Sequence, residues 1–107
     1  MSLDQENTVD AVGIEAATEM VVLSIVDSWA WEDETAHLLA LQKKLNAYFD
    51  FVSGGQLQES YPKAKGRKVR IDIIGKYPFP AGSLDFVGKA QQVAASRGID
   101  VVVKTVD

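Results

Sequence analysis

The only histidine in the chain, His37, is the side chain best suited to acid–base chemistry near neutral pH. It follows Asp33 by four positions and Glu34 by three, so either carboxylate would share its face of a helix and could hold and charge the imidazole. Lys44 and Tyr48 would continue this polar strip, which could act as a general base or bind a small anion. The alternative is the solvated flank of an amphipathic helix. The solvated flank is favoured, because no nucleophile stands at a recognisable spacing from these residues.

Two tryptophans, Trp29 and Trp31, stand just before this helix and project to the same side if the segment is extended. Paired indoles could form a platform for a ligand or an anchor in an interface. They could also form a corner of the hydrophobic core, which is the favoured role for at least one of them. A ligand pocket near His37 is therefore a hypothesis, and its contributing residues would be Trp31, His37, Lys44, Tyr48 and Tyr61.

Four acidic residues around the start of the helix, Asp27, Glu32, Asp33 and Glu34, could bind a hard cation through carboxylate oxygens. Their spacing does not match a calcium-binding loop, and the preference of a helix start for negative charge explains the last three. The chain has no cysteine, which excludes a thiolate metal site. No metal and no cofactor are expected. Because a Gly-rich nucleotide fingerprint is also missing, the sequence favours a protein that is not an enzyme.

Charge is distributed unevenly along the chain. Residues 1–42 contain nine acids and no lysine or arginine, whereas residues 63–70 contain five of the eleven bases. The candidate anion-binding residues of this basic segment are Lys63, Lys65, Arg67 and Lys68. The segment could bind a phosphate or an acidic protein patch, including the acidic half of a second copy, although most charge runs are simply solvated. The formal net charge of −4 argues against general affinity for nucleic acid.

The spacing of apolar residues predicts the elements that must position these side chains. Alternating apolar residues predict strands over residues 9–15, 20–27, 69–76 and 99–106. Apolar residues at intervals of three and four predict helices over residues 33–53 and 81–97. Gly54, Gly55 and Gly98 are expected to end these helices. Leu57 and Tyr61 are expected to form one helical turn in the long connection between the first helix and the third strand.

The resulting order, β-β-α-β-α-β, predicts an α/β (α+β) two-layer sandwich. The first two strands are close enough in sequence to form an antiparallel hairpin. Each later strand–helix–strand unit is expected to be right-handed, and two such units moving the same way put both helices on one face of a four-stranded mixed sheet. Residues 9–107 are expected to form this single domain, after a flexible N-terminus of residues 1–8.

The sheet face opposite to the helices is expected to be apolar. Its candidate interface residues are Met20, Val22, Val26, Ile74 and Val102. Large uncovered apolar patches usually mark an interaction surface, so the sequence favours a homodimer or a complex with another protein. The alternative is that a helix or the N-terminal segment covers this face.

Hydropathy and the N-terminal residues favour a soluble, cytoplasmic protein. Residues 1–10 carry three acids and no base, the reverse of a secretory signal. The longest aliphatic stretch, residues 20–26, is far shorter than the roughly 20 apolar residues of a membrane span. The lack of cysteine fits a reducing compartment.

A longer motif surrounds the candidate site. It runs through Trp31-Glu32-Asp33-Glu34, His37-Leu38, Leu41-Gln42-Lys43-Lys44-Leu45-Asn46 and Tyr48, and continues through Ser53-Gly54-Gly55-Gln56-Leu57 and Tyr61-Pro62. In this motif the chain resembles a family of short bacterial proteins catalogued as a domain of unknown function. The resemblance covers nearly the whole chain and implies a bacterial origin and a single domain. It implies no activity and no catalytic residue.

These patterns together favour a small, non-catalytic protein-interaction module that self-associates. One alternative is a ligand-binding or enzymatic domain with a pocket near His37. Another is an acidic immunity-type or antitoxin-type inhibitor of a basic partner, which rests on size and acidity alone.

Overall fold

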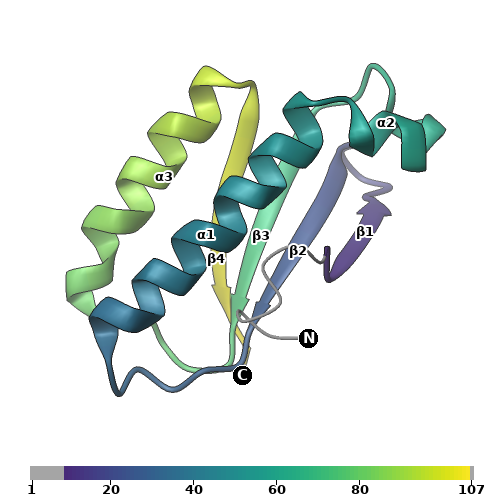
Figure 1. Cartoon of the computed structure of the whole chain (residues 1–107). Coiled ribbons are helices and arrows are strands. Elements are labelled where there is room, and N and C mark those ends of the chain that lie inside the picture. The colour runs from purple at the N-terminus through teal and green to yellow at the C-terminus, as the bar shows by residue number, and fades with distance from the viewer. Residues whose placement is uncertain (1–8, 107) are drawn as a thin grey trace.

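A four-stranded mixed sheet with two long helices on one face forms the body of the protein (Figure 1). The computed structural model describes residues 9–106; residues 1–8, expected to be flexible, and residue 107 lie outside the described range. The strands are β1 (Ala11–Ile14), β2 (Val21–Asp27), β3 (Val69–Gly75) and β4 (Ile99–Thr105). The α-helices are α1 (Glu34–Ser53), α2 (Gln56–Ser60) and α3 (Leu84–Ser96), and 3-10 turns span Pro62–Ala64 and Ala81–Ser83.

The strands lie in the order β1-β2-β3-β4. β1 pairs with β2 antiparallel, as the predicted hairpin requires, and β2–β3 and β3–β4 are parallel. The two crossovers through α1 and α3 therefore move in the same direction across the sheet, and both helices lie on the same face (Figure 1). The predicted two-layer sandwich and its element order are confirmed.

The sheet is apolar on the face that the helices cover. In β2 the inward residues Val21, Leu23 and Ile25 are fully buried, and the residues between them are only half-buried. Ile71 and Ile73 continue this inner face on β3. The alternation that predicted these strands thus separates the two faces correctly. In β1, Val12 and Ile14 were expected to share one face; Val12 packs against the core, whereas Ile14 stays exposed.

Helix α1 begins and ends close to its predicted bounds. The Asp33 side chain caps its start by accepting a hydrogen bond from the Ala36 amide, and Gly55, with φ of 84°, supplies the left-handed residue after its end. Its buried residues are His37, Leu41, Lys44, Leu45, Tyr48 and Phe49. The expected apolar stripe of this helix was Leu38, Leu41, Leu45, Tyr48, Phe49 and Val52. Leu38 and Val52 are only half-buried, whereas His37 and Lys44 are buried, so the buried face is rotated toward two ionisable side chains.

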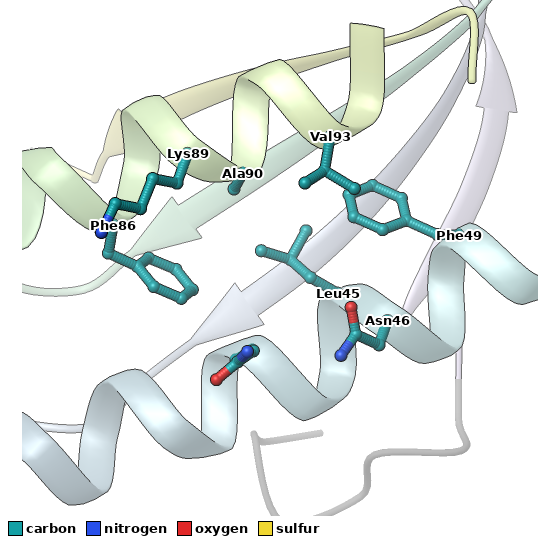
Figure 2. Close-up of a pocket in the computed structure, with 8 residues that line it drawn as sticks. Leu45, Asn46, Phe49, Phe86, Lys89, Ala90 and Val93 are labelled. Carbon is teal, nitrogen blue, oxygen red and sulfur yellow. The ribbon is translucent and has the colours of Figure 1, made fainter. Parts of the chain in front are cut away.

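The two long helices also contact each other. Leu45 and Phe49 of α1 face Phe86, Ala90 and Val93 of α3 across a shallow hollow of about 170 Å³ (Figure 2). The helix predicted over residues 81–97 begins as a 3-10 turn before it continues as α3, and Gly98 follows it in the left-handed conformation, with φ of 73°.

The long connection after α1 is pinned to the core as expected. Leu57, on the short helix α2, is buried, and so is Ala64 in the following 3-10 turn. Tyr61, which was expected to share the helical turn with Leu57, lies just after α2 and is 47% exposed.

Replacing Leu41 with alanine tests the core, because this fully buried side chain lies between α1 and the sheet. The cavity that Leu41→Ala leaves is expected to lower the free energy of unfolding by about 2–5 kcal/mol in urea denaturation. Leu39→Ala is the matched control, because Leu39 lies on the same helix and is 52% exposed. It is expected to change the unfolding free energy by less than about 0.5 kcal/mol, and a similar loss in both variants would contradict this assignment of the buried face.

Candidate functional site

A buried histidine–carboxylate pair lies where β2 ends and α1 begins. His37 Nε2 and Asp27 Oδ2 are 2.5 Å apart, and each residue is only 1% exposed. The second carboxylate oxygen of Asp27 accepts a hydrogen bond from the Trp29 amide at 3.1 Å. Because β2, β3 and β4 are parallel, their carboxyl ends meet at this edge of the sheet, beside the start of α1 (Figure 1).

Aromatic rings enclose the imidazole. The Trp31 ring stacks on His37 with centroids 3.6 Å apart and an interplanar angle of 12°. Trp29 meets the imidazole edge-on at 5.6 Å, and Phe79 lies against Trp31 at 5.1 Å. The two tryptophans therefore surround the only histidine of the chain.

Gly75 at the end of β3 helps to position this aromatic group. A Cβ atom at Gly75 would lie 2.7 Å from Phe79 Cε1. Only glycine at this position therefore leaves room for the Phe79 ring where it lies. The backbone around Gly75 ties the three carboxyl ends together, since Lys76 N–H donates to the Asp27 carbonyl and Val106 N–H donates to the Gly75 carbonyl.

The remaining imidazole nitrogen finds no hydrogen-bond partner in the described part of the chain. His37 Nδ1 is the one buried side-chain nitrogen or oxygen without a partner within residues 9–106. His37 also lines a cavity of about 400 Å³, together with Trp29, Ala30, Glu32, Asp33 and Ala36.

The expected partners of His37 were wrong. Asp33 caps the helix, and the carboxylate that binds the imidazole is Asp27, which lies on the neighbouring strand. A sequence signal for this was present. Asp27 continues the alternation Val21, Leu23, Ile25 by one more step and therefore faces the helices.

Lys44 and Tyr48 form a second buried polar cluster, in which their partner is Asp10. Lys44 Nζ lies 2.8 Å from Asp10 Oδ1, and both side chains are fully buried. The Tyr48 hydroxyl accepts a hydrogen bond from the Asp10 amide and donates one to the Ser24 carbonyl. The other Asp10 oxygen accepts from the Val26 amide, which lies beyond the last β1–β2 residue pair. These contacts fasten α1 to β2, so the expected solvated strip does not exist at these positions.

Burial raises the pKa of Tyr48 to about 12, from an ordinary value of 10.0, although the hydrogen bond from the Asp10 backbone opposes this shift. The folded state therefore holds the phenol proton more tightly than the unfolded state. The corresponding stabilisation is present below pH 10 and is lost as the pH rises toward 12.

The five residues of the hypothetical ligand pocket thus fall into three places. Trp31 and His37 are in direct contact at the carboxyl end of β2. Lys44 and Tyr48 lie further along α1 in the cluster with Asp10, and Tyr61 is on the surface beside the 3-10 turn.

The outer face, defined as the sheet face opposite to α1 and α3, keeps its aliphatic side chains partly exposed. Met20, Val22, Val26, Ile74 and Val102 are all half-buried, and no helix of residues 9–106 lies on this face. It also carries polar residues between these aliphatic ones.

An ion-pair network crosses the outer face. Arg70 binds Glu15 at 2.8 Å and Asp72 at 2.7 Å, and Lys104 lies 3.1 Å from Asp72. Hydrogen bonds from Arg70 and then Thr18 lower the pKa of Glu15 to about 2. Burial raises the pKa of Asp72, but hydrogen bonds from Arg70 and Lys104 outweigh burial and leave its pKa below the ordinary value.

The basic segment remains on the surface. Lys63, Lys65, Arg67 and Lys68 are exposed, and Arg67 donates hydrogen bonds to the carbonyls of Lys63 and Glu19. In the described part of the chain, no three His, Asp or Glu side chains are placed to hold a metal ion. No helix within residues 9–106 is long and apolar enough to cross a membrane.

The fold and these sites define a small two-layer α/β protein with a buried His–Asp pair and one sheet face that no helix of the described residues covers. The chain belongs to a family of unknown function, DUF6572, which it matches over residues 1–107. No curated protein and no solved structure matches it.

Replacing Tyr48 with phenylalanine tests the buried cluster. Tyr48→Phe is expected to lower the free energy of unfolding by about 1–3 kcal/mol in urea denaturation, because the Asp10 amide loses its acceptor in the interior. Tyr61→Phe is the matched control, because Tyr61 is 47% exposed and makes no such bonds within residues 9–106. The cluster would not stabilise the fold if both variants unfolded at the same urea concentration.

The ion-pair network predicts how the free energy of unfolding depends on pH. Since the folded pKa of Glu15 is about 2 against an ordinary 4.5, the unfolded state binds more protons between these pH values, and stability falls as the pH falls through this window. Arg70→Met is expected to make this slope shallower, as measured by urea unfolding at a series of pH values. Arg97→Met should leave the slope unchanged, because the one carboxylate that pairs with Arg97 within residues 9–106 belongs to the exposed Asp50. Equal slopes in all three proteins would contradict the role given to Arg70.

Proposed function

We propose that the protein is a non-catalytic interaction module that self-associates through its outer face. The observation that carries this proposal is the partial exposure of Val22, Val26, Ile74 and Val102 on a sheet face that has no helix among residues 9–106. Removing apolar surface from water contributes roughly 25 cal/mol per Å², so a second copy laid against this face would gain free energy from each of these side chains.

The charges of the outer face are compatible with a symmetric pair. A twofold dimer brings the same patch of both subunits together, so this patch has to complement itself. The outer face carries Arg70 and Lys104 beside Glu15 and Asp72, and Asp100 lies next to Arg70 in the strand register. When two such faces meet, acidic side chains of one copy can therefore lie opposite basic side chains of the other. This holds although the chain as a whole carries a net charge of −4.

Light scattering coupled to size-exclusion chromatography tests the proposal. The protein is expected to elute with the mass of a dimer at micromolar concentrations and to dissociate on dilution. Val22→Glu and Val102→Glu each place a carboxylate in the apolar part of the interface. Each is expected to weaken the association at least about tenfold, because a buried unpaired charge is costly.

The control is Val93→Glu, because Val93 is a 46% exposed valine on α3, on the opposite layer of the molecule. It should leave the dimer intact, and circular dichroism should show that all three variants are folded. A monomer at every concentration, or a dimer that neither outer-face substitution weakens, would disprove self-association through this face.

A further inference from the structure

We infer that the cavity beside His37 binds a primary ammonium group, a role separate from the association of the outer face. The cavity has a volume of about 400 Å³ and lies at the carboxyl end of β2, next to the start of α1. Its lining residues are Trp29, Ala30, Glu32, Asp33, Ala36 and His37. They offer a hydrogen-bond acceptor, negative charge and an aromatic ring, which together suit a cation that carries N–H groups.

The acceptor is His37 Nδ1. Both oxygens of Asp27 accept hydrogen bonds, one from the imidazole Nε2 and one from the Trp29 amide. When the ring is neutral, its single proton therefore lies on Nε2, and Nδ1 keeps a lone pair. This atom is buried and lacks a donor in the described part of the chain. Buried acceptors without a donor are uncommon, and an ammonium N–H could donate the missing hydrogen bond to His37 Nδ1.

The charge around the cavity favours a cation. Glu32 and Asp33 line it and are exposed, and neither forms an ion pair with any residue of the range 9–106. No lysine or arginine is among the lining residues. The two carboxylates would therefore attract a cation and oppose the preference of the helix start for negative charge.

Trp29 supplies the aromatic contact. Its ring is half-buried, lines the cavity and stands edge-on to the imidazole at 5.6 Å. A cation next to an indole face is stabilised by the charge distribution of the ring. Nδ1 is itself buried, so a donor can reach it only if neighbouring side chains shift. Because Trp29 lines the cavity and contacts the imidazole, binding should change the environment of this tryptophan.

Tryptophan fluorescence measures this binding directly, because Trp29 and Trp31 are the only tryptophans of the chain and both contact His37. The probe is n-butylammonium, and a saturable change in fluorescence is expected. Butyltrimethylammonium has the same charge and no N–H donor, so it is expected to bind at least about tenfold more weakly. The neutral alcohol 1-butanol is expected to give no saturable change.

Two further measurements locate the ammonium group. Glu32→Gln is expected to weaken binding several-fold, whereas Glu59→Gln, an exposed position on α2, should leave the affinity unchanged. Since His37 is the only histidine, ¹⁵N NMR resolves its two ring nitrogens without overlap. Saturation with n-butylammonium should shift the Nδ1 resonance more than the Nε2 resonance.

A lysine side chain and a free alkylamine carry the same group, and a blocked Gly-Lys-Gly peptide distinguishes them. Tighter binding of the peptide than of n-butylammonium assigns the site to a protein side chain, and weaker binding assigns it to a small amine. The inference is overturned if fluorescence does not saturate with either probe, if the trimethyl compound or 1-butanol binds as well as n-butylammonium, or if the Nδ1 resonance does not move.

Discussion

A carboxylate that is buried in a protein needs hydrogen-bond or charged partners there. The buried Asp27 carboxylate therefore determines how the residues at the carboxyl end of β2 are arranged. Desolvating such a group costs several kcal/mol unless hydrogen bonds and charge compensate. Asp27 sits at an inward position of β2, so its partners come from the segment that follows: the Trp29 amide and the His37 ring. The turn between β2 and α1, the stacking of Trp31 and the place of the cavity all follow from meeting this demand.

The second buried pair makes the position of α1 over the sheet unique. Asp10 and Lys44 lie well along the helix from His37, and Lys44 also rests among apolar residues of the core. Apolar side chains tolerate small displacements, whereas directional contacts between charged groups do not. A shift of α1 by one turn along β2 would separate both pairs and take each of the four side chains away from its ionisable partner. Only one register of the helix against the strand therefore keeps both pairs.

Much of this architecture could be predicted from periodicity, and the partners of the buried charges could not. Alternation separated the two faces of β2 and β3, and spacing located both long helices to within a few residues. The same patterns placed Asp27 inward and Lys44 between Leu41 and Leu45, but the residue types argued for solvent. Asp10 lies 34 residues from Lys44, and no local pattern reports such a contact. The family match confirmed the resemblance to a family of unknown function.

The short length of β1 has a consequence for how the molecule meets others. β1 pairs with β2 only as far as Ser24, so no strand of residues 9–106 lies beside the border of β2 beyond that point. Its Val26 amide is instead bound by the Asp10 carboxylate, and the Ser24 carbonyl receives the Tyr48 hydroxyl. Unpaired backbone N–H and C=O groups at the edge of a sheet can pair with a strand of another chain, which leads to aggregation. Here the side chains of Asp10 and Tyr48 already bind the Val26 amide and the Ser24 carbonyl, so these two groups are not available to pair with a strand of another chain.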